Sequence, residues 1–132
     1  MRFTVQPSSS IPIYAQLVEQ VKHAVASGRL QPGDLLPSLR EVAERLRISP
    51  LTVKKAYGEL ETLGIVATEH GRGTFIRAGA GDFSEQYKQE RLAEAADRLL
   101  VEAHHLGASV EDVVDLLRAR GRLLEREAKE RT

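Results

Sequence analysis

The chain has 132 residues, of which 42% are hydrophobic and 29% are charged, and it contains no cysteine. This length allows one ordinary domain, or one small domain with an appendage, and the missing cysteines exclude disulfides, thiolate catalysis and cysteine metal sites. No apolar stretch approaches the roughly 20 residues that span a bilayer, and the N-terminus lacks a signal-peptide pattern. We therefore expect a cytoplasmic protein with no membrane partner.

Charge is distributed unevenly along the chain. Lys and Arg together number 19, as do Asp and Glu, so the formal net charge is zero. Residues 1–78 carry 10 basic against 7 acidic side chains, a balance of +3, whereas residues 79–132 carry 9 against 12, a balance of −3. The asymmetry favours a first part that faces nucleic acid and an acidic second part.

The N-terminal part of the chain predicts one strand and one helix. Residues 3–5 are β-prone and predict a short strand, and the polar connection after them ends at a helix cap at Ser10. A helix then runs from Ile11 to a stop at Gly28, with Pro12 near its start. Residues 35–36 are long enough for only one rung of a small sheet. The apolar face of the helix is formed by Tyr14, Leu17, Val18, Val21 and Val25.

A second helix starts at Ser38, because Ser38 and Glu41 form a Ser-x-x-Glu capping box. Arg40 and Glu44 are left facing outward with Ser38. The buried stripe of this helix has apolar residues three and four apart, namely Leu39, Val42, Ala43 and Leu46.

A third helix follows a short connection at residues 47–48. Ser49 caps it, Pro50 is its first residue and Gly64 is its stop. Its interior glycine, Gly58, costs about 1 kcal/mol against alanine, which is consistent with a close approach at this position. The predicted buried stripe is Val53, Ala56, Tyr57, Leu60 and Leu63. The predicted outward face is Leu51, Thr52, Lys55 and Gly58, with Lys54 on its flank.

A β-hairpin is predicted next. The β-prone runs at 65–68 and 74–77 are joined by Glu69-His70-Gly71-Arg72-Gly73, whose glycines permit positive φ at a hairpin tip. A cation flanked by two glycines suits entry into a DNA minor groove. The same pattern also suits an ordinary solvated turn.

The composition of residues 78–81, Ala-Gly-Ala-Gly, predicts a hinge. A long helix over 83–106 should end at Gly107, and Ser109 with Asp112 should start a last helix that ends in a charged, fraying tail. Two helices in so short a segment cannot bury their apolar faces by themselves. We therefore expect the same helices of a second chain to cover these faces in a homodimer. The alternative is that they fold back on the first part of the chain. The predicted dimerisation residues are Leu92, Ala96, Leu99, Ala103, Leu106, Val113, Leu116, Leu117, Leu123 and Leu124.

Together these elements predict a mainly α fold with a small β-hairpin. A winged helix-turn-helix domain would occupy residues 11–79, and a helical dimerisation or effector tail would occupy residues 80–132. Helix, turn, helix and glycine-basic hairpin in unbroken order are typical of DNA-binding proteins, whereas a two-helix unit alone is common in all-α proteins.

Four runs of the chain resemble the GntR family of bacterial transcription regulators. They are P-I-Y-A-Q-L at 12–17, S-G-R-L-Q-P-G-D-L-L-P-S-L-R-E-V-A at 27–43, S-P-L-T-V-K-K-A-Y-G-E-L-E at 49–61 and H-G-R-G-T-F-I at 70–76. The resemblance covers residues 11–77, and the short two-helix segment after it resembles the YtrA subfamily, whose C-terminal part is a dimerisation element of about this size. Other branches append a much larger domain, for which this chain has no room.

The resemblance implies a sequence-specific transcriptional regulator near the bacterial nucleoid, namely a repressor that binds a pseudo-palindromic operator in double-stranded DNA as a homodimer. It implies no cofactor, and it allows a small-molecule effector whose identity the sequence does not give. Leu51 departs from the family, which usually has a polar residue there, and could touch a thymine methyl. The residues that match DNA-contacting positions are Ser38 and Arg40 at the second helix, Ser49, Thr52, Lys54 and Lys55 at the third, and His70, Gly71, Arg72 and Gly73 at the wing tip.

Three competing interpretations exist. An enzyme is disfavoured because no acid/base pair or activated nucleophile is visible, and because the adjacent His104 and His105 lie about 100° apart on a helix and cannot converge on one metal. A winged-helix module that binds protein in place of DNA is disfavoured by the outward basic residues. A truncated relative of the branch with an aminotransferase-like domain is disfavoured by the amphipathic tail.

Overall fold

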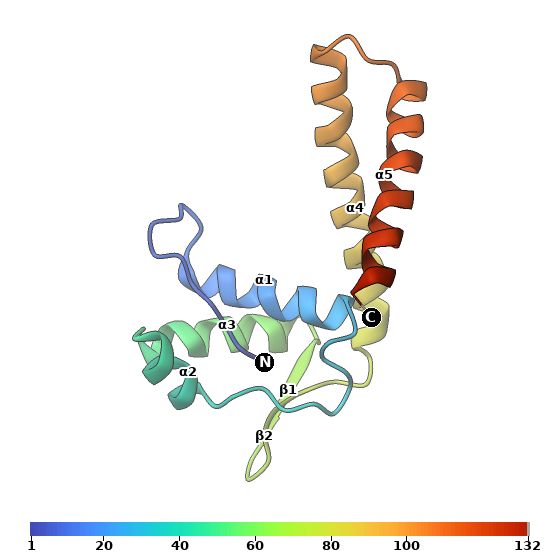
Figure 1. Ribbon diagram of the computed structural model, residues 1–132. Helices are drawn as coiled ribbons and strands as arrows, with labels where there is room; N and C mark the ends of the chain where they lie inside the picture. The colour runs from blue at the N-terminus through green and yellow to red at the C-terminus, as the bar shows by residue number, and fades with distance from the viewer. Residues whose placement is uncertain (132) are drawn as a thin grey trace. The chain divides into compact units, whose positions relative to one another are not determined.

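The computed structural model describes residues 1–131 and has five helices and one small antiparallel sheet within them (Figure 1). Contacts between residues divide the chain into two compact units, a first unit Met1–Gln89 and a second unit from Glu90 onward. The mainly α fold with a small hairpin is confirmed. In chain order the elements are α1 (Ile13–Ala26), α2 (Leu39–Leu46), α3 (Pro50–Thr62), β1 (Val66–Glu69), β2 (Gly73–Ile76), α4 (Ala80–His105) and α5 (Val110–Glu130).

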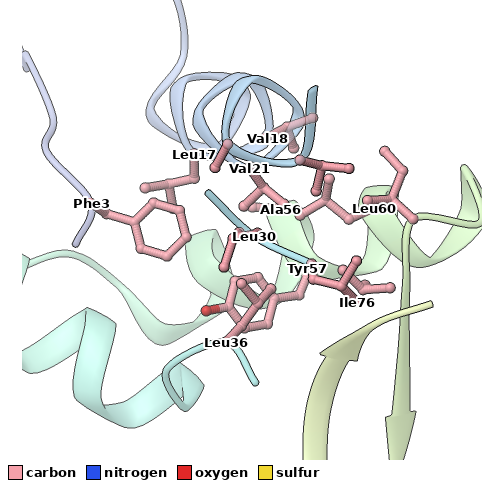
Figure 2. Close-up of a cluster of buried hydrophobic side chains, with 14 of the residues drawn as sticks. Phe3, Leu17, Val18, Val21, Leu30, Leu36, Ala56, Tyr57, Leu60 and Ile76 are labelled. Atoms are coloured by element: carbon pink, nitrogen blue, oxygen red, sulfur yellow. The ribbon is translucent and has the colours of Figure 1, made fainter. Parts of the chain in front are cut away.

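The core of the first unit lies between α1 and α3, with α2 packed against α3 (Figure 1). Figure 2 shows side chains of α1, α3 and β2 converging on this core. The predicted stripes of the three helices face it, with one exception. Leu63 is exposed, because α3 ends at Thr62 and Gly64 turns the chain with a φ of +77°, so that Ile65 enters the core in its place. The completely buried side chains include Phe3, Leu17, Val21, Val53, Leu60, Ile65 and Ile76.

The strand predicted at residues 3–5 is wrong. Phe3 is completely buried, but the backbone of this segment is paired with side chains of α1. The Gln20 amide accepts from the Thr4 N–H at 3.0 Å and donates to the Thr4 carbonyl at 2.7 Å. In the same way, the Gln16 amide accepts from the Gln6 N–H at 2.9 Å and donates to the Gln6 carbonyl at 3.1 Å. Glutamine side chains thus take the place of a neighbouring strand.

The cap predicted at Ser10 is also wrong. Helix α1 begins at Ile13, and the residue at its N-cap is Pro12, which makes no side-chain capping bond. The predicted stop is confirmed, since Gly28 follows the end of α1 with a φ of +79°.

The turn between α2 and α3 is fixed by backbone conformation and by one buried hydroxyl. Arg47 ends α2 in the left-handed region with a φ of +55°, which is uncommon for a residue other than glycine. The Tyr57 hydroxyl donates to the Pro37 carbonyl at 2.7 Å and so ties the middle of α3 to the start of α2. Burial of this hydroxyl, and then the negative charge of Glu41, raise the pKa of Tyr57 above its ordinary value.

The wing is the hairpin that β1 and β2 form, and its tip projects away from the helices of the first unit (Figure 1). Val66 pairs with Ile76 and Glu69 pairs with Gly73. The single rung predicted for residues 35–36 is confirmed, because Leu35 forms an isolated bridge with Phe75.

Helix α4 begins earlier than the sequence predicted. Residues 80 and 81 of the predicted hinge are helical, because Ala80 is buried in the core of the first unit. Ser84 and Tyr87 are buried as well, and the Tyr87 hydroxyl bonds to the Glu19 carboxylate of α1. The first unit therefore extends to Gln89, beyond the boundary predicted at residue 79, and the two functional domains stay a prediction.

The second unit pairs α5 with the later part of α4 as antiparallel helices (Figure 1). Gly107 ends α4 with a φ of +75°, as predicted. The predicted capping box is complete: the Ser109 hydroxyl accepts from the Asp112 N–H at 3.1 Å, and the Asp112 carboxylate accepts from the Ser109 N–H at 2.9 Å. The prediction of a fraying tail is wrong, because α5 continues to Glu130. Thr132 lies outside the described residues.

Candidate nucleic-acid interface

Two serines stand at the helix starts that the sequence assigned to DNA. The Ser38 hydroxyl accepts from the Glu41 N–H at 3.1 Å, and the Ser49 hydroxyl accepts from the Leu51 N–H at 3.2 Å. Each cap satisfies one amide of a first turn whose remaining N–H groups point outward. Together with the helix dipole, such amides make the starts of α2 and α3 suited to phosphate groups.

The outward face of α3 is exposed as predicted. Leu51 is 73% exposed, Lys54 and Lys55 are exposed, and Thr52 is half-buried. Gly58 lies on the same face, and a Cβ added to it would meet no atom within 4 Å. Nothing inside the described chain therefore requires a glycine at this position, although the residue weakens the helix.

Two basic side chains near the helix starts are held by neighbours. The Arg40 Nε lies 3.2 Å from a Glu44 carboxylate oxygen, in a pair so exposed, at 88% for Arg40, that it contributes little to stability. The Lys55 ammonium lies 4.0 Å from the centre of the Tyr14 ring of α1, a cation–π distance. Among residues 1–131, Lys54 makes no such contact, so its charge is free to meet a phosphate group.

The wing tip presents one cation between two glycines. Gly71 and Gly73 have φ angles of +83° and +104°, so the conformation of the tip needs both glycines. The Arg72 guanidinium stacks on Phe75, 3.9 Å from the ring centre, and lies 3.7 Å from a Glu69 carboxylate oxygen. His70 and Arg72 are both exposed, but entry into a minor groove would require Arg72 to exchange these partners for DNA.

In the second unit the predicted dimerisation residues form an apolar surface that the chain itself covers poorly. Only Ala103, at 7% exposure, and Val113, at 5%, are buried. A shallow pocket of about 190 Å³ lies between α4 and α5, and five of the predicted residues line it: Leu99, Ala103, Leu106, Val113 and Leu116. The exposed members of the predicted set are Leu92, Ala96, Leu106, Leu116, Leu117, Leu123 and Leu124.

Comparison with known proteins identifies the family. Residues 13–76 match the gntR family of bacterial regulatory proteins. Over 107 residues the chain is 41% identical to the HTH-type transcriptional repressor YtrA of Bacillus subtilis, an alignment that covers 81% of this chain and 82% of YtrA. This chain belongs to the gntR family.

Two further relatives support the membership. An uncharacterized HTH-type transcriptional regulator of Bacillus subtilis, YhcF, is 36% identical over 110 residues, which cover 83% of this chain and 90% of YhcF. The crystal structure of a transcriptional regulator from Oenococcus oeni superposes with a TM-score of 0.72 at 33% identity, covering 88% of this chain and 96% of that one. As a member of the gntR family, the chain is a DNA-binding transcriptional regulator.

The intramolecular partners of Arg40 and Lys55 in this gntR-family protein were not predicted from the sequence. Glu44 follows Arg40 by four residues, a spacing that predicts helix ion pairs, so a local pattern could have identified it. Tyr14 and Lys55 lie on different helices, and no local pattern connects them.

No metal site or membrane span was found in the described part of the chain. Residues 1–131 contain no group of three His, Asp or Glu side chains that could hold a metal ion. None of the described helices is long and apolar enough to cross a membrane.

Proposed function

We propose that this regulator is a repressor that binds a pseudo-palindromic DNA operator as a homodimer. One observation carries the proposal: the capped start of α3 directs Leu51 and Lys54 away from the core, in a helix-turn-helix followed by a wing. Such a helix enters the major groove with its N-terminal residues at the base edges. The relative YtrA of Bacillus subtilis is itself named a transcriptional repressor.

Five of the predicted contact residues have an assigned role in this proposal. Ser38 and Ser49 present the amides of the helix starts to phosphates, and Lys54 contacts the DNA backbone alone. Arg40 reaches a phosphate or a base edge after leaving Glu44, and Arg72 enters the minor groove beside the wing glycines. Phosphate contacts set the position of the protein on DNA, whereas base contacts set the sequence that it prefers.

The dimer is formed in the proposal by the tail at residues 80–132, and DNA is bound by the domain at residues 11–79. The exposed leucines of α4 and α5 support this division, because a second copy would remove them from water. Two-fold symmetry of the dimer then requires two half-sites related by the same symmetry. The proposed protein acts in the cytoplasm, beside the nucleoid, and has no catalytic role.

We propose no effector site in the second unit. The apolar pocket there, at about 190 Å³, is smaller than the roughly 300–1,000 Å³ of pockets that hold drug-sized ligands. An effector, where one acts, would have to change the geometry of the dimer.

The direct test is fluorescence anisotropy of the protein on DNA from upstream of its own gene, against scrambled DNA, across a series of salt concentrations. We expect preference for the upstream DNA, two chains per site and a steep loss of affinity with salt, because each neutralised phosphate releases counterions. Absence of binding even at low salt would contradict DNA binding and favour a protein-interaction module.

Lys54→Ala should weaken binding to all DNA sequences alike. Loss of one phosphate contact per chain lowers the slope of log affinity against log salt by about 0.9, hence by about two for a dimer. Lys88→Ala is the matched control, because Lys88 is also exposed but lies on α4, outside the predicted contact set. A change of sequence preference in Lys54→Ala would contradict its assignment to the backbone.

A further inference from the structure

Leu51 points directly away from the core of the first unit. It is the second residue of α3 and is 73% exposed. Leu60 follows nine residues later and is completely buried. At about 100° per residue these two side chains lie about 180° apart around the helix axis. The Leu51 N–H already donates to the Ser49 hydroxyl at 3.2 Å, so this residue offers its apolar side chain alone to a partner.

The surroundings of Leu51 on α3 do not form a protein-docking patch. The outward residues one and two turns further along are Lys54, Lys55 and Gly58, two cations and a residue without a side chain. Protein interfaces use contiguous apolar patches of several hundred Å², which one leucine does not provide. One apolar side chain ahead of two cations instead matches a DNA groove, where apolar groups on the bases lie between rows of phosphates.

We infer that Leu51 contacts the C5-methyl group of a thymine in the major groove and makes the operator specific for thymine at that step. This inference rests on the proposed function. The thymine methyl is the largest apolar group that base pairs present in the major groove, where cytosine carries only a hydrogen at C5 and the other specific groups are hydrogen-bond donors or acceptors. Leucine cannot form the hydrogen bonds that those polar groups would lose when it displaces their water. It therefore disfavours cytosine and the purines at the same step.

The test begins with duplexes that the wild-type protein selects from a random-sequence DNA library. Each thymine of a selected duplex is then replaced singly by deoxyuridine, which removes the methyl group and keeps every hydrogen-bonding group. We expect one thymine per half-site at which the replacement weakens wild-type binding about fourfold, the change that corresponds to one methyl-sized apolar contact. Anisotropy titration measures the dissociation constant for each duplex.

Leu51→Asn supplies the decisive comparison, because it should bind the thymine and deoxyuridine duplexes equally well at that position. Leu63→Asn is the matched control, since Leu63 is also exposed but lies at the other end of α3, and it should keep the fourfold difference. Circular dichroism checks that both variants fold.

Specific binding without sensitivity to any deoxyuridine, or sensitivity that persists in Leu51→Asn, would overturn the inference and leave the proposed function standing. Failure of the library to yield any preferred sequence would overturn the proposed function, and the inference with it.

Discussion

The first unit encloses most of its apolar side chains, whereas the second unit leaves most of its own in water. Leu17, Val53 and Leu60 of the three-helix core are completely buried. Among the hydrophobic residues from 90 to 131, only Ala103 and Val113 are buried. The large exposed ones range from Val114, at 38% exposure, to Leu106, at 75%. Both units consist of amphipathic helices, so the difference lies in how many surfaces meet.

Three helices and a hairpin can surround a common interior, but two antiparallel helices can only bury the line along which they touch. Hydrophobic stabilisation is roughly proportional to the apolar area removed from water. A unit that leaves its leucines exposed therefore gains little from folding alone, and it gains much when a second copy covers them. The comparison thus predicts that changes in the first unit alter folding, whereas changes in the second unit alter assembly.

The largest expected effect is that of Leu60→Ala in the first unit. Replacing a completely buried leucine leaves a cavity, so the free energy of unfolding should fall by about 2–5 kcal/mol. Urea denaturation followed by circular dichroism measures this loss. Leu63→Ala changes an exposed leucine near the end of the same helix and should cost less than about 0.5 kcal/mol. Equal losses in the two variants would break the contrast between core and surface.

Leu117→Glu in the second unit should separate the chains without unfolding the first unit. Leu117 is exposed in one chain, so a carboxylate is tolerated there, but in the dimer it would be buried without a partner. We expect a monomer at micromolar concentration and at least about tenfold weaker operator binding, which corresponds to about 1.4 kcal/mol. Sedimentation velocity and anisotropy measure the two effects.

The matched control for that prediction is Ala119→Glu. It adds the same charge to α5, about 160° away from Leu117 around the helix at about 100° per residue. This variant should remain dimeric. Dissociation of both variants, or of neither, would count against dimerisation through the leucine face.

The smallest expected effect is the loss of a pH dependence in Asp112→Asn. The backbone N–H of Ser109, and then its hydroxyl, hold the pKa of Asp112 below its ordinary value of 3.8. A lowered pKa in the folded state means that the carboxylate stabilises α5 above about pH 3.8 and loses this effect as pH falls through the lower folded value. Thermal unfolding between pH 6 and pH 2.5 should show this extra acid destabilisation in the wild type and not in the variant.

Asp115→Asn is the control for the acid titration, because Asp115 lies one turn further along the same helix, outside the capping box. It should retain the acid destabilisation of the wild type. If Asp112→Asn and the wild type lost stability in parallel, the capping box would not contribute to the stability of the second unit.

The parts of the fold that the sequence predicted depend on residues close together in the chain. Ser49 with Pro50, and Ser109 with Asp112, mark helix starts within four residues, and the structure confirms both. Gly107 marks a helix end in the same local manner. The apolar spacing of α1 and α3 identified the core face because the period of a helix is fixed by its backbone.

The wrong predictions depend on contacts between distant residues. A β-prone segment at residues 3–5 forms no strand because Gln20, sixteen residues after Thr4, satisfies its backbone. The hinge was predicted from composition, but burial of Ala80 in the first unit decides where α4 begins. The exposed position of Lys55 was predicted correctly, but its contact with Tyr14 on another helix was not predicted, because no local spacing connects the two residues. The proposed DNA contacts stay predictions for a further reason: their partner is another molecule.

Sedimentation velocity of the wild-type protein at micromolar concentration, alone and with its selected operator duplex, tests the central claim most directly. We predict a species of twice the 14.6 kDa chain mass in the absence of DNA, and two chains on each duplex in its presence. A 14.6 kDa species in the absence of DNA, together with one chain on each duplex, would contradict a dimeric, operator-binding repressor.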